Sequence, residues 1–69
     1  MAMTRKDYVS VANILNVELL CAELTPENSI ETLETIRYHI NSIANTFCKV
    51  ASADNSNFDK ARFLGACGL

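Results

Sequence analysis

The residues that most often carry out chemistry in proteins are few in this chain and widely spaced. It contains one histidine, His39, and three cysteines, Cys21, Cys48 and Cys67. Nucleophilic catalysis needs a thiol beside a histidine, and a tetrahedral metal site needs four such ligands. Cys48 lies nine residues from His39, and no two cysteines have C-x-x-C spacing. We therefore expect a protein that is not an enzyme, holds no metal or cofactor, and keeps three free thiols.

Acidic and basic residues are separated along the chain. Positions 18 to 37 contain five glutamates and one arginine, a balance of −4, whereas the remainder carries five basic and three acidic residues, a balance of +2. Three glutamates have the spacing i, i+4, i+7 that places side chains on one helical face; they are Glu27, Glu31 and Glu34. We expect this acidic face, with Tyr38 beside it, to bind a basic surface of a host protein. The alternative is a solvated face that keeps the protein soluble.

A second candidate site lies in the basic part of the chain. Two basic residues follow an expected helix start, where backbone N–H groups favour anions, and two more lie near the other end of the sequence. The predicted anion-binding set is Thr4, Arg5, Lys6, Lys60 and Arg62. Alternatively, these charges are solvated and pair with neighbouring aspartates. Direct nucleic-acid binding is not expected, because the net charge is −2 and phosphate contacts need a basic excess.

Helices must position these residues. Glycine is absent before Gly65 and the only proline is Pro26, so two long segments flank one break. Thr4 and Asp7 have capping-box spacing, which predicts a first helix over about residues 5–23. Proline is favoured at the first helical position, and Thr25-Pro26 therefore predicts a second helix over about residues 26–53. Ser29 is an alternative cap for this second helix.

The last part of the chain predicts a short third helix over about residues 60–66. Asp59 is a candidate N-cap, and Gly68 can end the helix. The connector between the first two helices is short, which forces them to run antiparallel. The predicted fold is all-α: a single small domain over residues 1–69, built as a two-helix hairpin with a C-terminal helix folded back on it.

Apolar spacing predicts which faces of the two long helices are buried. In the second helix, apolar residues recur every 3.5 residues, as in a near-parallel packing seam: Leu33, Ile36, Ile40, Ile43, Phe47 and Val50. In the first helix, one stripe faces the second helix: Tyr8, Ala12, Leu15, Leu19 and Ala22.

The first helix has more apolar surface than this single seam requires. A second stripe consists of Val11, Ile14, Val17 and Cys21. Chains below ~70–80 residues rarely build a sufficient core alone and often oligomerise. We expect the second stripe to form the interface of a homodimer. Coverage by the chain's own C-terminal part is the alternative.

Both ends of the chain carry recognisable motifs. Residues 3–8 read M-T-R-K-D-Y, and residues 54–68 follow the pattern D-N-x-x-F-D-x-x-R-F-L-x-A-C-G. In both, the chain resembles a group of short proteins encoded by tailed bacteriophages and prophages. Members often have Pro-Arg in place of Ser56-Asn57 and Glu in place of Ala61, so the final turn is expected to be looser here. The resemblance implies a phage origin and a bacterial cytoplasm, and it supplies no catalytic residue.

These features predict a non-catalytic phage accessory protein that binds a host macromolecule, for example an inhibitor of bacterial antiviral defence of the anti-CRISPR kind. A small-ligand binder that sequesters an anionic nucleotide signal at the basic end is the alternative, and a purely structural dimer is a third interpretation. No membrane association is expected, because a membrane span needs ~20 mostly apolar residues and the apolar runs here are interrupted by Glu18 and Glu23. No export signal is expected at the start of the chain.

Overall fold

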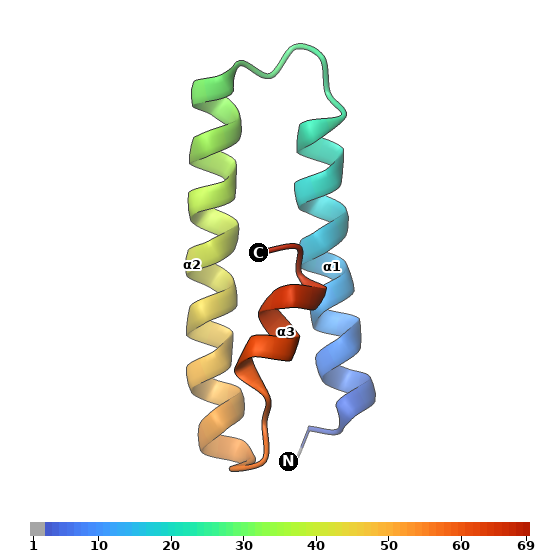
Figure 1. The fold of residues 1–69 in the computed structure, drawn as a ribbon, viewed down its shortest axis with the longest axis vertical. Coiled ribbons are helices and arrows are strands. Elements are labelled where there is room, and N and C mark those ends of the chain that lie inside the picture. Colours follow the sequence, from blue (N-terminus) through green and yellow to red (C-terminus); the bar gives the residue numbers. More distant parts are fainter. Residues whose placement is uncertain (1–2) are drawn as a thin grey trace.

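The computed structural model describes residues 3–69, which form the three helices α1 (Arg5–Glu23), α2 (Ile30–Asp54) and α3 (Lys60–Ala66). The two long helices run antiparallel as a hairpin, and α3 lies against one half of it (Figure 1). Within residues 3–69 there is no strand, so the predicted all-helical architecture is confirmed. None of these helices combines the length and apolar character that crossing a bilayer requires.

α1 begins and ends where the sequence predicts. The Thr4 hydroxyl accepts a hydrogen bond from the Asp7 N–H (3.4 Å), and the Asp7 carboxylate accepts one from the Thr4 N–H (2.9 Å). This capping box satisfies two backbone donors that the helix start would leave unpaired. The Met3 N–H donates to the Asp54 carboxylate at 2.8 Å, which ties the start of α1 to the end of α2.

α2 begins at Ile30, four residues later than predicted. Ser29 is the N-cap, and its hydroxyl accepts a hydrogen bond from the Thr32 N–H (3.1 Å). The connector before it serves the end of α1 instead: the Thr25 hydroxyl donates to the Cys21 carbonyl (2.7 Å), and the Asn28 amide donates to the Ala22 carbonyl (2.9 Å). Because these bonds satisfy carbonyls at the end of α1, the connector stays non-helical and Pro26 lies in a turn.

α3 follows the predicted boundaries. Asp59 caps it by accepting a hydrogen bond from the Arg62 N–H at 3.0 Å. After the helix, Gly68 adopts a φ of +85°, a left-handed conformation that favours glycine. A Cβ on Gly68 would lie only 2.8 Å from the Asn16 Oδ1 atom. The Gly68 carbonyl accepts a hydrogen bond from the Arg37 Nη2 atom (3.2 Å), so the C-terminal turn is held against both long helices.

The face of α2 that is buried differs from the predicted seam. The buried residues among positions 3–69 are Ala12, Leu15, Leu19, Ile40, Ala44, Cys48, Ala51, Phe63 and Cys67. The predicted seam residues Ile43 and Val50 are instead 56% and 58% exposed, so that prediction is wrong at these two positions. The reason is α3: with two elements packed on it, α2 turns its small side chains inward, and Phe63 and Cys67 of α3 fill the core beside them.

The predicted inward stripe of α1 is confirmed at its centre, where Ala12, Leu15 and Leu19 are buried. Aromatic rings close the core at the end that contains α3. The Tyr8 and Phe58 rings meet edge to face with centroids 4.7 Å apart, and the Phe47 and Phe63 rings stack at 5.0 Å. Edge-to-face and stacked pairs at these distances stabilise a core beyond their buried area.

Candidate functional site

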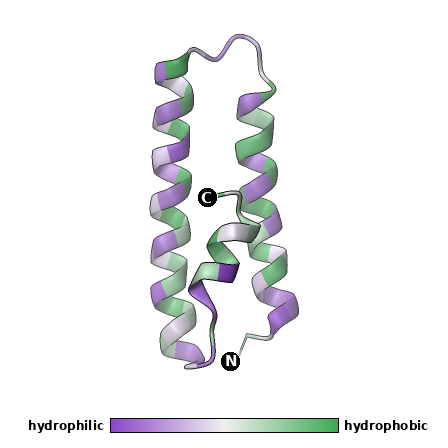
Figure 2. Cartoon of the chain, in the orientation of Figure 1, coloured by the Kyte–Doolittle hydropathy of each residue, from purple (hydrophilic) through white to green (hydrophobic). Residues whose placement is uncertain are grey.

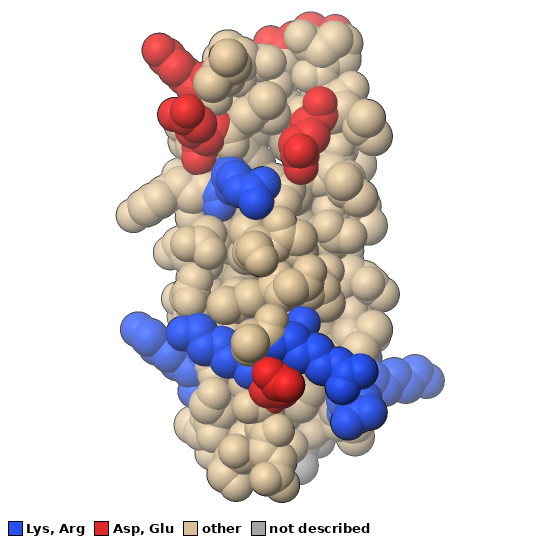
Figure 3. All heavy atoms as spheres, in the orientation of Figure 1, with Lys and Arg blue, Asp and Glu red and all other residues tan. Residues whose placement is uncertain are grey.

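Most acidic residues seen in Figure 3 gather toward the end of the hairpin that contains the α1–α2 connector, with one basic residue close to them, whereas the other basic residues form a belt across the other half, with one acidic residue among them. The structure brings Glu31, Glu34 and Tyr38 to one face of α2 and leaves all three exposed. Glu27 does not share this helical face as predicted, because it lies in the connector before Ile30. It remains exposed close to the start of α2.

Two large apolar side chains accompany these glutamates. Leu24 is 81% exposed and Ile30 is 76% exposed, and they lie on either side of the connector. Their role in this surface could not be predicted from the sequence, because their exposure depends on where α1 ends and α2 begins. We call this surface the acidic tip; it consists of Leu24, Glu27, Ile30, Glu31 and Glu34, with Tyr38 at its edge, 69% exposed.

The second stripe of α1 is open to solvent along most of its length. Ile14 is 63% exposed, Val17 is 53% exposed and Cys21 is also exposed, whereas Val11 is half-buried against the core. Figure 2 shows apolar residues recurring along the whole of both long helices. α3 therefore leaves an apolar surface uncovered at the centre of α1.

A cavity of about 440 Å³ lies at the basic end of the molecule, between α1, α3 and the connector that precedes α3. We call it the basic cavity. Of the five residues predicted to bind an anion, the structure brings Arg5 and Arg62 together on its wall. Thr4, Lys6 and Lys60 do not line it, and the Thr4 hydroxyl is engaged in the capping box of α1.

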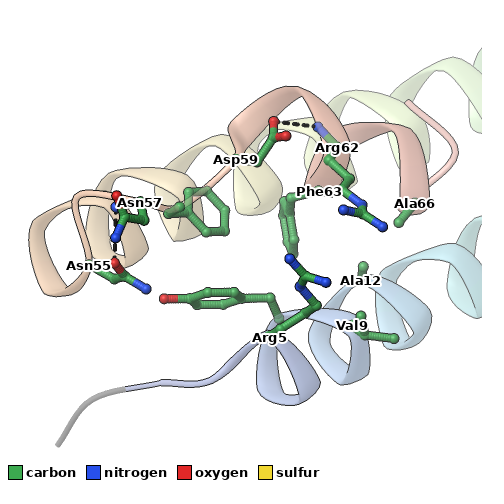
Figure 4. Close-up of a pocket in the computed structure, with 11 residues that line it drawn as sticks. Arg5, Val9, Ala12, Asn55, Asn57, Asp59, Arg62, Phe63 and Ala66 are labelled. Atoms are coloured by element: carbon green, nitrogen blue, oxygen red, sulfur yellow. Dashed lines mark hydrogen bonds between the residues drawn. The ribbon is translucent and has the colours of Figure 1, made fainter.

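Much of the remaining wall of the basic cavity consists of aromatic rings and asparagine side-chain amides. Phe58 and Phe63 provide apolar rings, and Asn55 and Asn57 provide polar groups (Figure 4). The Tyr8 hydroxyl is buried in this wall and has no hydrogen-bond partner among residues 3–69. Tyr8, Asn55 and Asn57 are not among the residues predicted from the sequence to form this site, because only the folding-back of α3 brings them to one cavity with Arg5.

The three thiols are free and occupy different environments. Cys21 is exposed, whereas Cys48 and Cys67 are 2% and 0% exposed. Burial raises the pKa of the Cys48 thiol, and the nearby charge of Lys60 opposes this effect in part. Burial also raises the pKa of the Cys67 thiol, and the neighbouring Cys48 adds to the increase. Within residues 3–69, no three histidine, cysteine or acidic side chains lie together as a metal site.

These environments predict selective alkylation. In the native protein, iodoacetamide is expected to modify Cys21 alone, because the thiolate is the reactive species and the two core thiols are both covered and held neutral. Mass spectrometry of digested protein checks this result, with a sample in denaturant as the control in which all three thiols react. Rapid modification of Cys67 in the native protein would contradict the packing of α3.

The same thiols predict the direction of a stability change at high pH. Their pKa values in the folded protein exceed the ordinary value of 9.0. Their contribution to the free energy of unfolding is therefore complete below pH 9.0 and is lost as the pH rises through the folded pKa values.

Comparison of this chain with family models, with curated proteins and with solved structures finds no match in any of the three.

Proposed function

We propose that this protein is a non-catalytic accessory protein of a bacteriophage or prophage that binds a macromolecule of the bacterial host through its acidic tip. The observation that carries the proposal is the exposure of Leu24 and Ile30, 81% and 76%, beside a group of glutamates. These two side chains contribute little to the core of the protomer. Their placement favours a role in contact with another molecule.

The composition of the acidic tip defines the kind of partner that it fits. A few well-packed side chains at the centre of an interface supply most of its binding energy, and charges around them guide association and orientation. Residues 18 to 37 carry a balance of −4, so the complementary surface is basic and has apolar pockets. A host protein that normally binds nucleic acid has such a surface, and occupying it would inhibit that protein. Inhibition of an antiviral defence nuclease, as by an anti-CRISPR protein, is the proposed role, and its place is the bacterial cytoplasm.

The test is a capture experiment that compares two charge reversals. Tagged protein is incubated with bacterial lysate, the captured protein is identified and purified, and its affinity is then measured directly. Glu27→Lys with Glu31→Lys is expected to weaken the affinity by about 100-fold or more, since each reversed charge meets a basic surface. Arg5→Glu with Lys6→Glu reverses the same number of charges at the other end and is expected to leave the affinity within about twofold.

A neutral substitution separates specific contact from general charge attraction. Leu24→Ala removes an exposed apolar side chain without changing charge or burying anything in the core. It is expected to weaken the affinity by about 30-fold, the effect of truncating one of the few residues that dominate an interface. If the purified partner binds the Leu24→Ala and the doubly reversed proteins as well as the unchanged protein, the acidic tip is not the contact surface and the proposal is wrong.

We also propose that the protein is a homodimer formed through the second apolar stripe of α1, which we call the α1 stripe: Val11, Ile14, Val17 and Cys21. The α1 stripe of one copy packs on that of a second copy. The exposed side chains Ile14 and Val17 lie at the middle of α1. α1 carries Arg5 and Lys6 at its start and Glu18 and Glu23 at its end. Antiparallel packing centred on Ile14 would bring the basic start of one α1 beside the acidic end of the other. This charge complementarity favours a second copy as the occupant of the α1 stripe.

A further inference from the structure

The two arginine side chains of the basic cavity are not engaged by other residues of the described chain. Arg5 comes from α1 and Arg62 from α3, and neither guanidinium makes an ion pair or hydrogen bond with any residue from 3 to 69. By contrast, Arg37 donates to the Gly68 carbonyl. Two guanidinium groups that extend toward each other across a cavity repel each other, so an anion between them removes an unfavourable interaction as well as adding a favourable one.

The chemistry of the rest of the wall restricts the anion. Phe58 and Phe63, whose ring centroids are 5.6 Å apart, offer apolar surface next to the arginines. A bare inorganic ion would leave the apolar surface of these rings exposed to water, whereas a ligand that carries an aromatic ring would cover it. The volume of about 440 Å³ lies within the range of pockets that take small organic ligands, roughly 300–1,000 Å³.

The polar groups of the wall include donors that the fold leaves unused. The Tyr8 hydroxyl is buried without a partner, and a buried unpaired hydroxyl lowers the stability of a protein. The side-chain Oδ1 of Asn55 accepts a hydrogen bond from the Asn57 N–H (2.9 Å), whereas the side-chain Nδ2 of Asn55 makes no hydrogen bond among residues 3–69. A hydrogen-bond acceptor on a ligand would satisfy the side-chain amide of Asn55, which lines the cavity.

One acidic residue also lines the basic cavity. The Asp59 carboxylate accepts the hydrogen bond that caps α3, and it lies beside the start of that helix (Figure 4). With Arg5 and Arg62 it leaves the cavity wall with a charge of +1. The anionic group is therefore expected on the side of the two arginines, which in Figure 4 extend toward each other from opposite walls, and the ring on the side of Phe58 and Phe63.

We propose that the basic cavity binds an aromatic phosphate monoester of about the size of a mononucleotide. The phosphate is held by Arg5 and Arg62, which suit a dianion because each guanidinium donates two parallel hydrogen bonds. The aromatic ring lies against Phe58 and Phe63. The proposal does not depend on the acidic tip, which lies at the other end of the molecule (Figure 3).

Calorimetric titration of the full chain with phenyl phosphate tests this proposal, with inorganic phosphate and phenol as separate probes. Phenyl phosphate is expected to bind at least tenfold more tightly than either probe, because only it engages both parts of the cavity. A panel of nucleoside monophosphates then compares larger rings. Inorganic phosphate binding as tightly as phenyl phosphate would indicate an adventitious ion only and would overturn the proposal.

Three variants locate the binding. Arg5→Gln and Arg62→Gln are each expected to weaken phenyl phosphate binding by about tenfold or more, the usual effect of losing a charged hydrogen bond. Lys6→Gln is the matched control, since it removes one charge from the same turn of α1 outside the cavity, and its affinity is expected within twofold of the unchanged protein. Melting curves confirm that each variant folds. Equal weakening by Lys6→Gln and Arg5→Gln would overturn the proposal, as would unaltered binding by both arginine variants.

Discussion

Replacing Phe63 by alanine is expected to leave most of the protein unfolded at 25 °C. Phe63 is 4% exposed and stacks on Phe47 with ring centroids 5.0 Å apart. Truncating a buried phenylalanine typically costs ~3–5 kcal/mol. The whole core of a chain this short rarely supplies more than ~3–5 kcal/mol. The expected loss is therefore comparable to the total stability, and α3 would detach from the hairpin.

Far-UV circular dichroism and urea unfolding at matched protein concentration measure this effect. Tyr38→Ala is the control, because it removes an aromatic ring from a position that is 69% exposed. Its free energy of unfolding is expected to change by no more than about 0.5 kcal/mol, as for most surface substitutions. A Phe63→Ala protein that melts within a few degrees of the unchanged one would contradict the central place of the aromatic rings in the core.

The second large effect is expected at Ile14. In the proposed antiparallel dimer, Ile14→Glu would bury two carboxylates against each other, one from each copy. Leaving a charge unpaired at an interface costs ~3–5 kcal/mol, so the dissociation constant is expected to increase by at least about 100-fold. Sedimentation equilibrium measures the change. The unchanged protein is also expected to dissociate more readily at high salt, because its charges are complementary across the interface.

Ser42→Glu is the matched control for this experiment. It adds the same charge at an exposed position of α2, outside α1. Its dissociation constant is expected to remain within a few-fold of the unchanged value. If the unchanged protein sediments as a monomer at micromolar concentration and melts cooperatively, the α1 stripe is not a dimer interface.

The features of the fold that could be predicted from the sequence are local ones. The starts of α1 and α3 depend on Thr4 and Asp59, whose side chains accept hydrogen bonds from backbone groups only three residues away. Such contacts are visible as residue spacing. The predicted start of α2 is too early, because the side chains of Thr25 and Asn28 hydrogen-bond to carbonyls at the end of α1. The spacing of these residues does not show whether they cap the end of α1 or the start of α2.

The features that could not be predicted depend on how α3 docks. The 3.5-residue pattern of α2 assumes a single neighbour, whereas the structure packs α2 against both α1 and α3 and buries Ala44 in place of Ile43. The same docking creates the basic cavity. Charge separation along the hairpin was predictable from the positions of the charged residues in the sequence, and so was the placement of Arg5 and Arg62 at the same end of the molecule, where both line one cavity. The proximity of Tyr8 to the α2–α3 connector was not, because 50 residues separate Tyr8 from Phe58.

The anchoring of the C-terminal turn has a practical consequence for the placement of fusion partners. Leu69 packs against the core, and the Gly68 carbonyl is held by Arg37. An affinity tag or fluorescent reporter appended after Leu69 would compete with these contacts. Met3, in contrast, lies at the end of the hairpin opposite the connector (Figure 1), so a reporter joined ahead of it leaves both the glutamate-rich surface and the last turn undisturbed.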